Sequence, residues 1–257
     1  MGFKAILKKQ LKVFIKNPGV FVQFIIYPAI AWMILFFMDF DAMTGGMEYI
    51  EGITYEFLET FRQNMAANTP NMVTMQATIF AGMALIPVMA GFIAEDIEKK
   101  SLRFLTMAGV KPAAYLFGIG IVVAFFALLS SVAFSFISEF NGVDFWVFVG
   151  AMMSGVLGSI MLGATIGILT KNQQNATALS MPIAMVVGMG PLIAQFNGTV
   201  ANALRFVYTQ QLNIVADSLN GIITETPLWQ SFAIMWANVA VFGAVFIVVY
   251  KKKGIKE

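Results

Sequence analysis

Long uncharged stretches alternate with short charged segments along the whole chain. Six stretches contain no Asp, Glu, Lys or Arg, at about 20–38, 72–94, 113–137, 145–169, 176–196 and 229–250. Each can cross a hydrocarbon core of ~30 Å, because an α-helix rises ~1.5 Å per residue. The stretches are continuous apolar runs without the period-two alternation of barrel strands, which favours helices. The pattern predicts an all-α integral membrane protein with six transmembrane helices in a single domain, residues 1–257.

The polar segments at the first two spans predict an interfacial helix and a loop. Residues 3–16 place apolar side chains on one helical face and lysines on the other, as in a helix that lies in the membrane interface. A merely basic flank is the alternative reading. The acidic segment 39–70 is expected to be a solvated loop, in which 48–66 could form a short helix.

Two further segments predict short helices outside the spans. In the segment 95–112 we expect a helix at about 99–108, with Ser101 as its candidate N-cap and Gly109 and Pro112 as stop signals. Residues 197–228 contain too many apolar side chains for a solvated loop. We expect them to form short or re-entrant helices that dip into the outer leaflet or cover an exit.

Composition and charge agree with this reading and set an orientation. The chain is 59% hydrophobic and 12% charged, whereas soluble domains carry about 25% charged residues. Alternate threading of the spans places every Lys and Arg except Arg62 and Arg205 on one side, and most Asp and Glu on the other. Short basic loops stay in the cytoplasm, so both termini are expected there. The lysines suit anionic membrane lipid, and nothing suggests nucleic acid.

Small residues recur at a spacing of four in the fourth and fifth stretches. They are Gly155, Ser159, Gly163 and Gly167 in the fourth, and Ala176, Ser180, Ala184 and Gly188 in the fifth. Such stripes let helix backbones approach closely. The simplest expectation is that the two stripes pack against each other across the hairpin; a dimer interface or a translocation path is the alternative.

The residue types present argue against catalysis in this chain. There is no histidine, no cysteine and no G-x-x-x-x-G-K-[ST] motif, so we expect no catalytic residue, no metal site and no cofactor here. The spans carry neutral polar residues, of which four are candidates either for interhelical hydrogen bonds or for lining a substrate path: Gln23, Tyr27, Gln76 and Asn238. Without a buried ionisable group, the chain either conducts passively or takes energy from a partner. The segment 95–112 is suited to receive one.

At that segment the sequence resembles the permease subunits of type-2 ABC transporters. In that family an acidic cluster ends the second span, a basic and apolar coupling helix follows, and a turn with proline enters the third span. The matching residues are Glu95-Asp96-Ile97-Glu98-Lys99-Lys100-Ser101-Leu102-Arg103-Phe104-Leu105 and Val110-Lys111-Pro112. The start of the chain, with Lys8–Leu11 and Lys16-Asn17-Pro18, also looks like the family's interfacial helix.

The resemblance implies partners and a set of docking residues. A second permease, identical or paralogous, would face this one, and separate ABC ATPase subunits would bind ATP and Mg²⁺. The residues implied to dock the ATPase are Glu95, Asp96, Glu98, Lys99, Lys100, Leu102, Arg103, Phe104, Leu105 and Met107. The expected setting is a bacterial or archaeal plasma membrane.

The resulting hypothesis is the membrane subunit of an ATP-driven exporter. Its cargo would be amphipathic: a drug, a peptide such as an antimicrobial peptide, or a lipid. The chain contains 25 Phe and 18 Met residues, whose side chains adapt to varied apolar ligands. Lipid-facing helices show the same enrichment, so this composition is only weak evidence for an apolar cargo. One alternative is an ion-coupled secondary transporter or a channel that works without an ATPase, and another is a scaffold that binds partners but moves no cargo.

Overall fold

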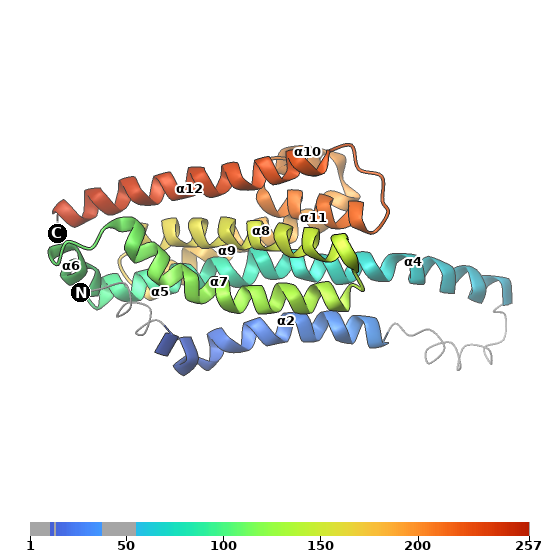
Figure 1. Ribbon diagram of the computed structural model, residues 1–257, viewed down its shortest axis with the longest axis horizontal. Coiled ribbons are helices and arrows are strands. Elements are labelled where there is room, and N and C mark those ends of the chain that lie inside the picture. The colour runs from blue at the N-terminus through green and yellow to red at the C-terminus, as the bar shows by residue number, and fades with distance from the viewer. Residues whose placement is uncertain (1–10, 13, 38–54, 257) are drawn as a thin grey trace.

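The computed structural model describes residues 11–12, 14–37 and 55–256, and all regular structure in them is helical (Figure 1). Within these residues, six apolar segments are long enough to cross a membrane: Pro18–Phe36, Asn68–Glu98, Pro112–Ile137, Gly142–Leu169, Gln173–Phe196 and Leu228–Lys252. They lie side by side in one bundle (Figure 1). The predicted all-α membrane fold with six spans is confirmed.

Five spans are single helices, and each begins or ends within a few residues of its uncharged stretch. They are α2 (Pro18–Phe37), α7 (Pro112–Ile137), α8 (Gly142–Leu169), α9 (Gln173–Phe196) and α12 (Leu228–Lys256). Most of the predicted interfacial helix 3–16 lies outside the described residues. At its end, Phe14 is fully buried and its ring stacks on that of Phe126, with centroids 4.4 Å apart.

The second span is one long rod with a π-helical turn in its middle. It consists of α4 (Tyr55–Ile79), the π-helix η2 (Phe80–Ala84) and α5 (Leu85–Glu98). Pro87 follows the π-helix closely. A proline ring clashes with the carbonyl four residues earlier and offers no N–H to it, and a wider turn relieves both problems.

The rod extends beyond the predicted span, and α4 projects from the end of the bundle (Figure 1). Residues 55–70 are therefore helical: the solvated loop expected here was wrong, whereas the short helix considered at 48–66 is present from residue 55 on, as part of a longer helix. Extending an existing helix costs far less than nucleating one, and Glu, Leu, Gln, Met and Ala in this segment are good helix formers. The rest of the predicted loop, up to residue 54, lies outside the described residues.

The rod is also the most buried span, and it separates the two stripes of small residues. A Cβ atom at Gly163 would lie 2.5 Å from the carbonyl oxygen of Ile86, and one at Gly167 would lie 2.6 Å from that of Ala90. On the other side, Gly188 of α9 meets Gly82, and Ala184 packs in a cluster with Ile86 and Ala90.

The expectation that the two stripes pack against each other is therefore wrong. Both face the second span, because η2 and α5 present their own small residues, Gly82, Ala90 and Ala94, toward the neighbouring helices. Helices α8 and α9 follow each other in the chain and are joined by a short connection. In space, however, the second span lies between them over much of their length.

The predicted apolar segment before the last span forms two short helices, α10 (Gly198–Leu204) and α11 (Tyr208–Leu219). Helix α11 is buried on one side, with Tyr208, Leu212, Val215 and Ala216 in the main core. Helix α10 has no buried residue. The two short helices agree with the prediction, and α11 packs into the core of the bundle, which the prediction did not include.

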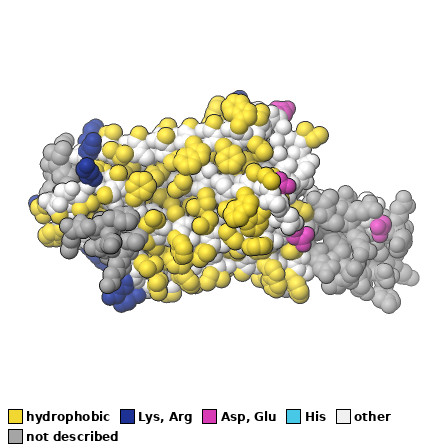
Figure 2. Space-filling model, in the orientation of Figure 1, with side chains coloured by type: hydrophobic (Ala, Val, Ile, Leu, Met, Phe, Trp, Pro, Cys, Tyr) yellow, Lys and Arg dark blue, Asp and Glu magenta, His cyan; other side chains and the backbone are white. Residues whose placement is uncertain are grey.

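Charge marks the two ends of the bundle. One end carries α6 (Ser101–Met107), the start of α2 and the end of α12 (Figure 1), and Lys and Arg side chains gather there (Figure 2). Lys99 and Lys251 belong to segments at this end, next to α6 and near the end of α12. We call this the basic end. The opposite end holds the connections from α7 to α8 and from α11 to α12 (Figure 1), which include Glu139, Asp144 and Glu225, and we call it the acidic end. Between them, hydrophobic side chains cover the visible face (Figure 2).

Candidate functional site

Helix α6 at the basic end is the candidate surface for a partner. Of its apolar residues, Leu102 is only 9% exposed and Leu105 packs partly against the core. Phe104 and Met107, three residues apart on the helix, are 67% and 65% exposed. Residues three apart share a helix face, so α6 has one face that anchors it and another that presents two large apolar side chains.

The basic side chains at α6 add to this surface. Lys99, Lys100 and Arg103 are all exposed. The Lys99 ammonium lies 2.5 Å from a Glu95 carboxylate oxygen, and this contact raises the pKa of Lys99. Lys100 has φ 57° and Gly109 has φ 74°, so left-handed residues flank the helix on both sides and set its direction.

Two members of the acidic cluster that precedes α6, the buried Asp96 and the exposed Glu98, join helices. Asp96 is 4% exposed and accepts a hydrogen bond of 3.1 Å from the Tyr115 hydroxyl of α7. The Tyr115 ring lies 5.8 Å from that of Tyr250 in α12. Glu98 accepts a hydrogen bond of 3.0 Å from the backbone N–H of Gln173, the first residue of α9. The first backbone N–H groups of a helix have no acceptor within the helix, and the Glu98 carboxylate supplies one for α9.

Part of the docking set implied by the resemblance is therefore corrected. Asp96 and Leu102 are buried inside the bundle and are not accessible to another protein. Leu105 is mostly occupied by contacts within the chain. The exposed members are Glu98, Lys99, Lys100, Arg103, Phe104 and Met107, and Glu95 is partly exposed. The sequence could not separate them, because a seven-residue helix does not reveal which of its faces meets the bundle.

The structure does not bring the four candidate path-lining residues together. Tyr27 of α2 packs on Phe80, with ring centroids 5.7 Å apart, and Gln76 lies one turn before Phe80. Gln23 is partly buried, and its amide oxygen has no partner in the described part of the chain. Asn238 instead donates to the carbonyl oxygens of Phe206 and Ile234, both at 2.8 Å. Asn238 thus ties α12 to the turn between α10 and α11.

A polar contact that sequence reasoning missed holds α11 in the bundle. The Ser159 hydroxyl donates to the carbonyl of Ala81 in the π-helix and lies 2.7 Å from the Tyr208 hydroxyl. Since the single Ser159 proton goes to Ala81, Tyr208 is the donor to Ser159. Thr209 also donates to the carbonyl of Val187, at 2.5 Å. Ala81 lies near the middle of the second span, so α11 begins deep inside the bundle.

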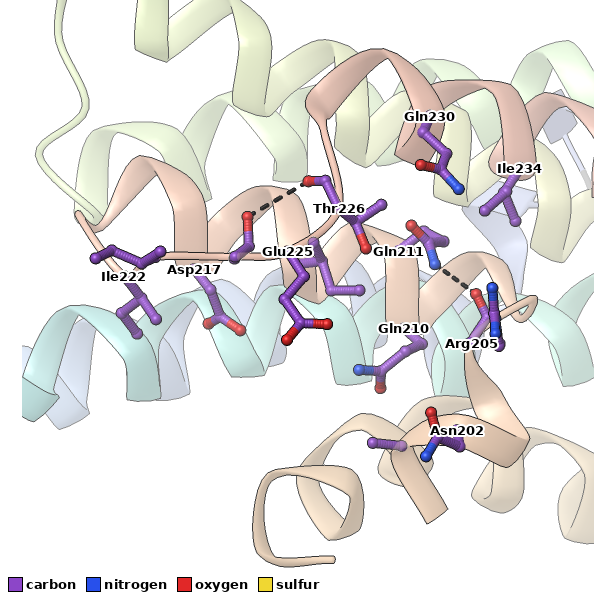
Figure 3. A pocket seen from close by; sticks show the side chains of 14 residues that line it. Asn202, Arg205, Gln210, Gln211, Asp217, Ile222, Glu225, Thr226, Gln230 and Ile234 are labelled. Carbon is purple, nitrogen blue, oxygen red and sulfur yellow. Dashed lines mark hydrogen bonds between the residues drawn. The ribbon is translucent and has the colours of Figure 1, made fainter. Parts of the chain in front are cut away.

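A polar pocket opens at the acidic end. It has a volume of about 420 Å³ and is bounded by α10, α11, the segment 220–227 and the start of α12 (Figure 3). Its polar side chains are those of Asn202, Arg205, Gln210, Gln211, Asp217, Thr224, Glu225, Thr226 and Gln230. The only sequence signal for it was the mixture of apolar and polar residues in 197–228.

Comparison with known proteins adds one finding. The model of a family described as ABC-2 family transporter protein matches residues 48–248. This match covers well over half of the chain, from the region of α4 to near the end of α12. No curated protein matches the sequence.

Proposed function

Because this chain belongs to the ABC-2 transporter family, we propose that it is the membrane-spanning subunit of an ATP-driven exporter. The chain contains no P-loop motif, and its six uncharged stretches contain no Asp, Glu, Lys or Arg. These two features favour energy from ATP that is hydrolysed by a partner ATPase over energy from an ion gradient. The basic end is cytoplasmic in this proposal, since short basic loops stay on that side.

The observation that carries the proposal is the exposed apolar face of α6. Phe104 and Met107 lie at the basic end, in a helix that is anchored by Leu102. Exposed apolar side chains rimmed by charge are typical of protein interaction sites. Arg103 and the two neighbouring lysines supply that rim. We infer that a cytoplasmic ABC ATPase binds here, with Phe104 and Met107 in a groove on its surface.

The contacts around α6 support a route for mechanical coupling. Helix α6 follows α5 after a two-residue turn, and Glu98 at the end of α5 holds the first N–H of α9. A push on α6 by the ATPase would therefore move the second and fifth spans together. Asp96 and Tyr115 join α5 to α7 at the same level, so the third span would follow. ATP binding would close the two ATPase subunits and tilt these spans to open the path outward.

The cargo path is proposed to lie between this subunit and a second permease, identical or paralogous. Helix α9 exposes Met181, Met185 and Val186 along one face, and Pro182 and Pro191 interrupt its hydrogen bonding. Methionine side chains adapt to ligands of varied shape. This face suits an amphipathic cargo such as a drug, a peptide or a lipid.

The docking proposal is tested by replacing Phe104 and Met107 together with Asp. A carboxylate cannot enter an apolar groove without a large desolvation cost, so the double variant should lose its ATPase partner. The control is Phe104→Leu with Met107→Leu, which keeps the surface apolar. The measurement is the amount of ATPase that co-purifies with each variant from membranes. Co-purification of the Asp variant at the wild-type ratio would mean that α6 does not dock the ATPase.

A further inference from the structure

The last span reaches the docking helix, although the coupling route proposed above does not include it. Helix α12 runs as one helix from Leu228 at the acidic end to Lys256 at the basic end, where α6 lies (Figure 1). An α-helix rises ~1.5 Å per residue, so α12 is long enough to cross the whole bundle. It therefore extends from the docking surface to the opposite end of the molecule.

The segment that follows α6 is fixed to the last turn of this helix. Gly109 has φ 74°, and the backbone N–H of Val110 donates a hydrogen bond of 3.0 Å to the carbonyl oxygen of Leu105. This pairing around a left-handed glycine is the Schellman ending of a helix. A force on Val110 therefore acts on α6 as a whole, including the exposed face with Phe104 and Met107.

Tyr250 of α12 holds this segment from the side of the last span. Tyr250 is 4% exposed, and its hydroxyl donates a hydrogen bond of 3.4 Å to the carbonyl oxygen of Val110. The centre of its ring lies 5.9 Å from that of Phe246 and 5.8 Å from that of Tyr115. Since Tyr115 also binds Asp96, the helices α5, α7 and α12 meet beside the end of α6.

The rest of α12 has few contacts that resist its movement. It is the least buried of the six spans, and its outer side exposes large apolar side chains. Two further polar contacts hold it in the described part of the chain. Thr165 of α8 donates to the carbonyl oxygen of Phe242 at 3.1 Å, and Asn238 donates to that of Phe206 at 2.8 Å. Elements with few buried contacts are the ones that move at low cost in free energy.

We propose that Tyr250 is a positioning residue for the docking helix, and that through it the last span moves together with α6. The role of this link in transport rests on the ATPase docking proposed above, but the link itself is a property of the isolated chain. A push on α6 shifts Val110, Val110 carries Tyr250 with it, and α12 tilts against α8. The contact of Asn238 with the Phe206 carbonyl passes the tilt to the turn between α10 and α11. Chains of packed and hydrogen-bonded residues can carry coupling between distant sites in this way.

The first test is amide hydrogen exchange of the purified full chain in detergent, without ATPase or ATP. Tyr250→Phe keeps the ring contacts and removes only the hydroxyl, so the protein is expected to fold. Exchange in residues 101–110 should become about fivefold faster, because the lost hydrogen bond stabilises the closed form of this segment by roughly that factor. Unchanged exchange in residues 101–110 would overturn the proposal.

Two controls show whether the effect is local. Tyr208→Phe also removes a buried hydroxyl that is hydrogen-bonded to another helix, but it lies in the interior of the bundle, away from α6. It should leave exchange in residues 101–110 unchanged. In Tyr250→Phe, exchange in the middle of α8 should stay as in the wild type. An equal increase in α8 and α6 would mean that Tyr250 only stabilises the bundle as a whole, which contradicts a positioning role.

The second test measures whether α12 moves with α6 in the complex with the ATPase. The chain contains no cysteine, so spin labels can be attached at Val248→Cys in α12 and Leu169→Cys at the end of α8, both exposed positions. A non-hydrolysable ATP analogue should change the distance between the labels by about 2 Å, the scale of helix shifts in switching proteins. In Tyr250→Phe the ATPase should still bind, because Phe104 and Met107 are intact, but the change in distance should become smaller.

The outcomes separate this proposal from the docking proposal. If no ATPase binds, the proposed function fails, and the exchange experiment alone still decides whether Tyr250 positions α6. If the ATPase binds but the label distance stays constant in the wild type, or changes equally in Tyr250→Phe, the docking stands and the link through Tyr250 is wrong.

Discussion

At the scale of single residues, one serine joins three separate parts of the chain. The Ser159 hydroxyl donates to the Ala81 carbonyl of the second span and accepts from the Tyr208 hydroxyl of α11. The π-helical turn departs from the regular α-helical hydrogen bonding of the second span. At this turn the Ser159 hydroxyl of α8 donates a hydrogen bond to a backbone carbonyl, that of Ala81. The ring of Tyr208 also covers Gly158, where a Cβ atom would lie 2.9 Å from the ring carbon Cγ.

This geometry predicts unequal effects of two substitutions. Tyr208→Phe removes one hydrogen bond but leaves Ser159 paired with Ala81, so it should cost ~1 kcal/mol. Ser159→Ala leaves the Tyr208 hydroxyl unpaired in the interior and also removes the side-chain donor to the Ala81 carbonyl, so it should cost more, roughly 2–3 kcal/mol. The measurement is the midpoint of thermal unfolding in detergent, where ~1 kcal/mol corresponds to about 2–4 °C. A larger loss for Tyr208→Phe than for Ser159→Ala would contradict the donor assignment.

At the scale of elements, the second span organises the bundle, and its neighbours are adapted to it. Helix α5 lies against α8 on one side and α9 on the other, and each neighbour brings a stripe of small residues to the contact. At the crossing of η2 with α9, Gly82 and Gly188 meet backbone to backbone. The spacing of four predicted close packing correctly, because it places small residues on one helix face. It could not predict the partner, since any smooth helix face fits such a stripe.

The stripe yields a prediction with a control in the same helix. Gly163→Ala would place a methyl group 2.5 Å from the Ile86 carbonyl oxygen and 2.9 Å from Met89 Cβ, so α8 and α5 must separate. Such overpacking should destabilise the protein by roughly 1–3 kcal/mol. In Gly150→Ala, also in α8, the new methyl group meets nothing within 4 Å and should leave stability unchanged or slightly higher. Thermal unfolding in detergent compares the two; equal effects would contradict the packing of α8 on α5.

Some of the structural elements could be predicted from the sequence alone, and others could not. All six spans were predictable, because each uncharged run, as a helix, is about as long as the bilayer core is thick, or longer. The π-helix and the extension of α4 from Tyr55 were not, since they depend on Pro87, on contacts with distant Gly188, and on helix propagation past the apolar run. The sequence predicted which segment forms the docking surface. It could not predict that Asp96 and Leu102 are buried, because their burial depends on how α5, α6 and α7 pack together.

At the scale of the whole molecule, the features divide between the two ends. The basic end offers an exposed apolar helix next to contacts that link α5, α7 and α9. The acidic end holds the helical hairpin α10–α11 and its polar pocket. Membership of the ABC-2 family and the uncharged interiors of the spans together suggest that energy enters at the basic end. The sequence anticipated this division through the distribution of lysine and carboxylate along the chain.

The central claim is that this chain is driven by a separate ATPase that binds at α6. Its most direct test is affinity purification of the intact protein from its native membrane, followed by identification of the subunits and measurement of ATP hydrolysis in lipid. The account predicts a P-loop ATPase in stoichiometric amount, with hydrolysis that disappears when Phe104 and Met107 are both replaced by Asp. A chain that purifies without any ATPase and by itself carries ion flux across vesicle membranes would contradict it.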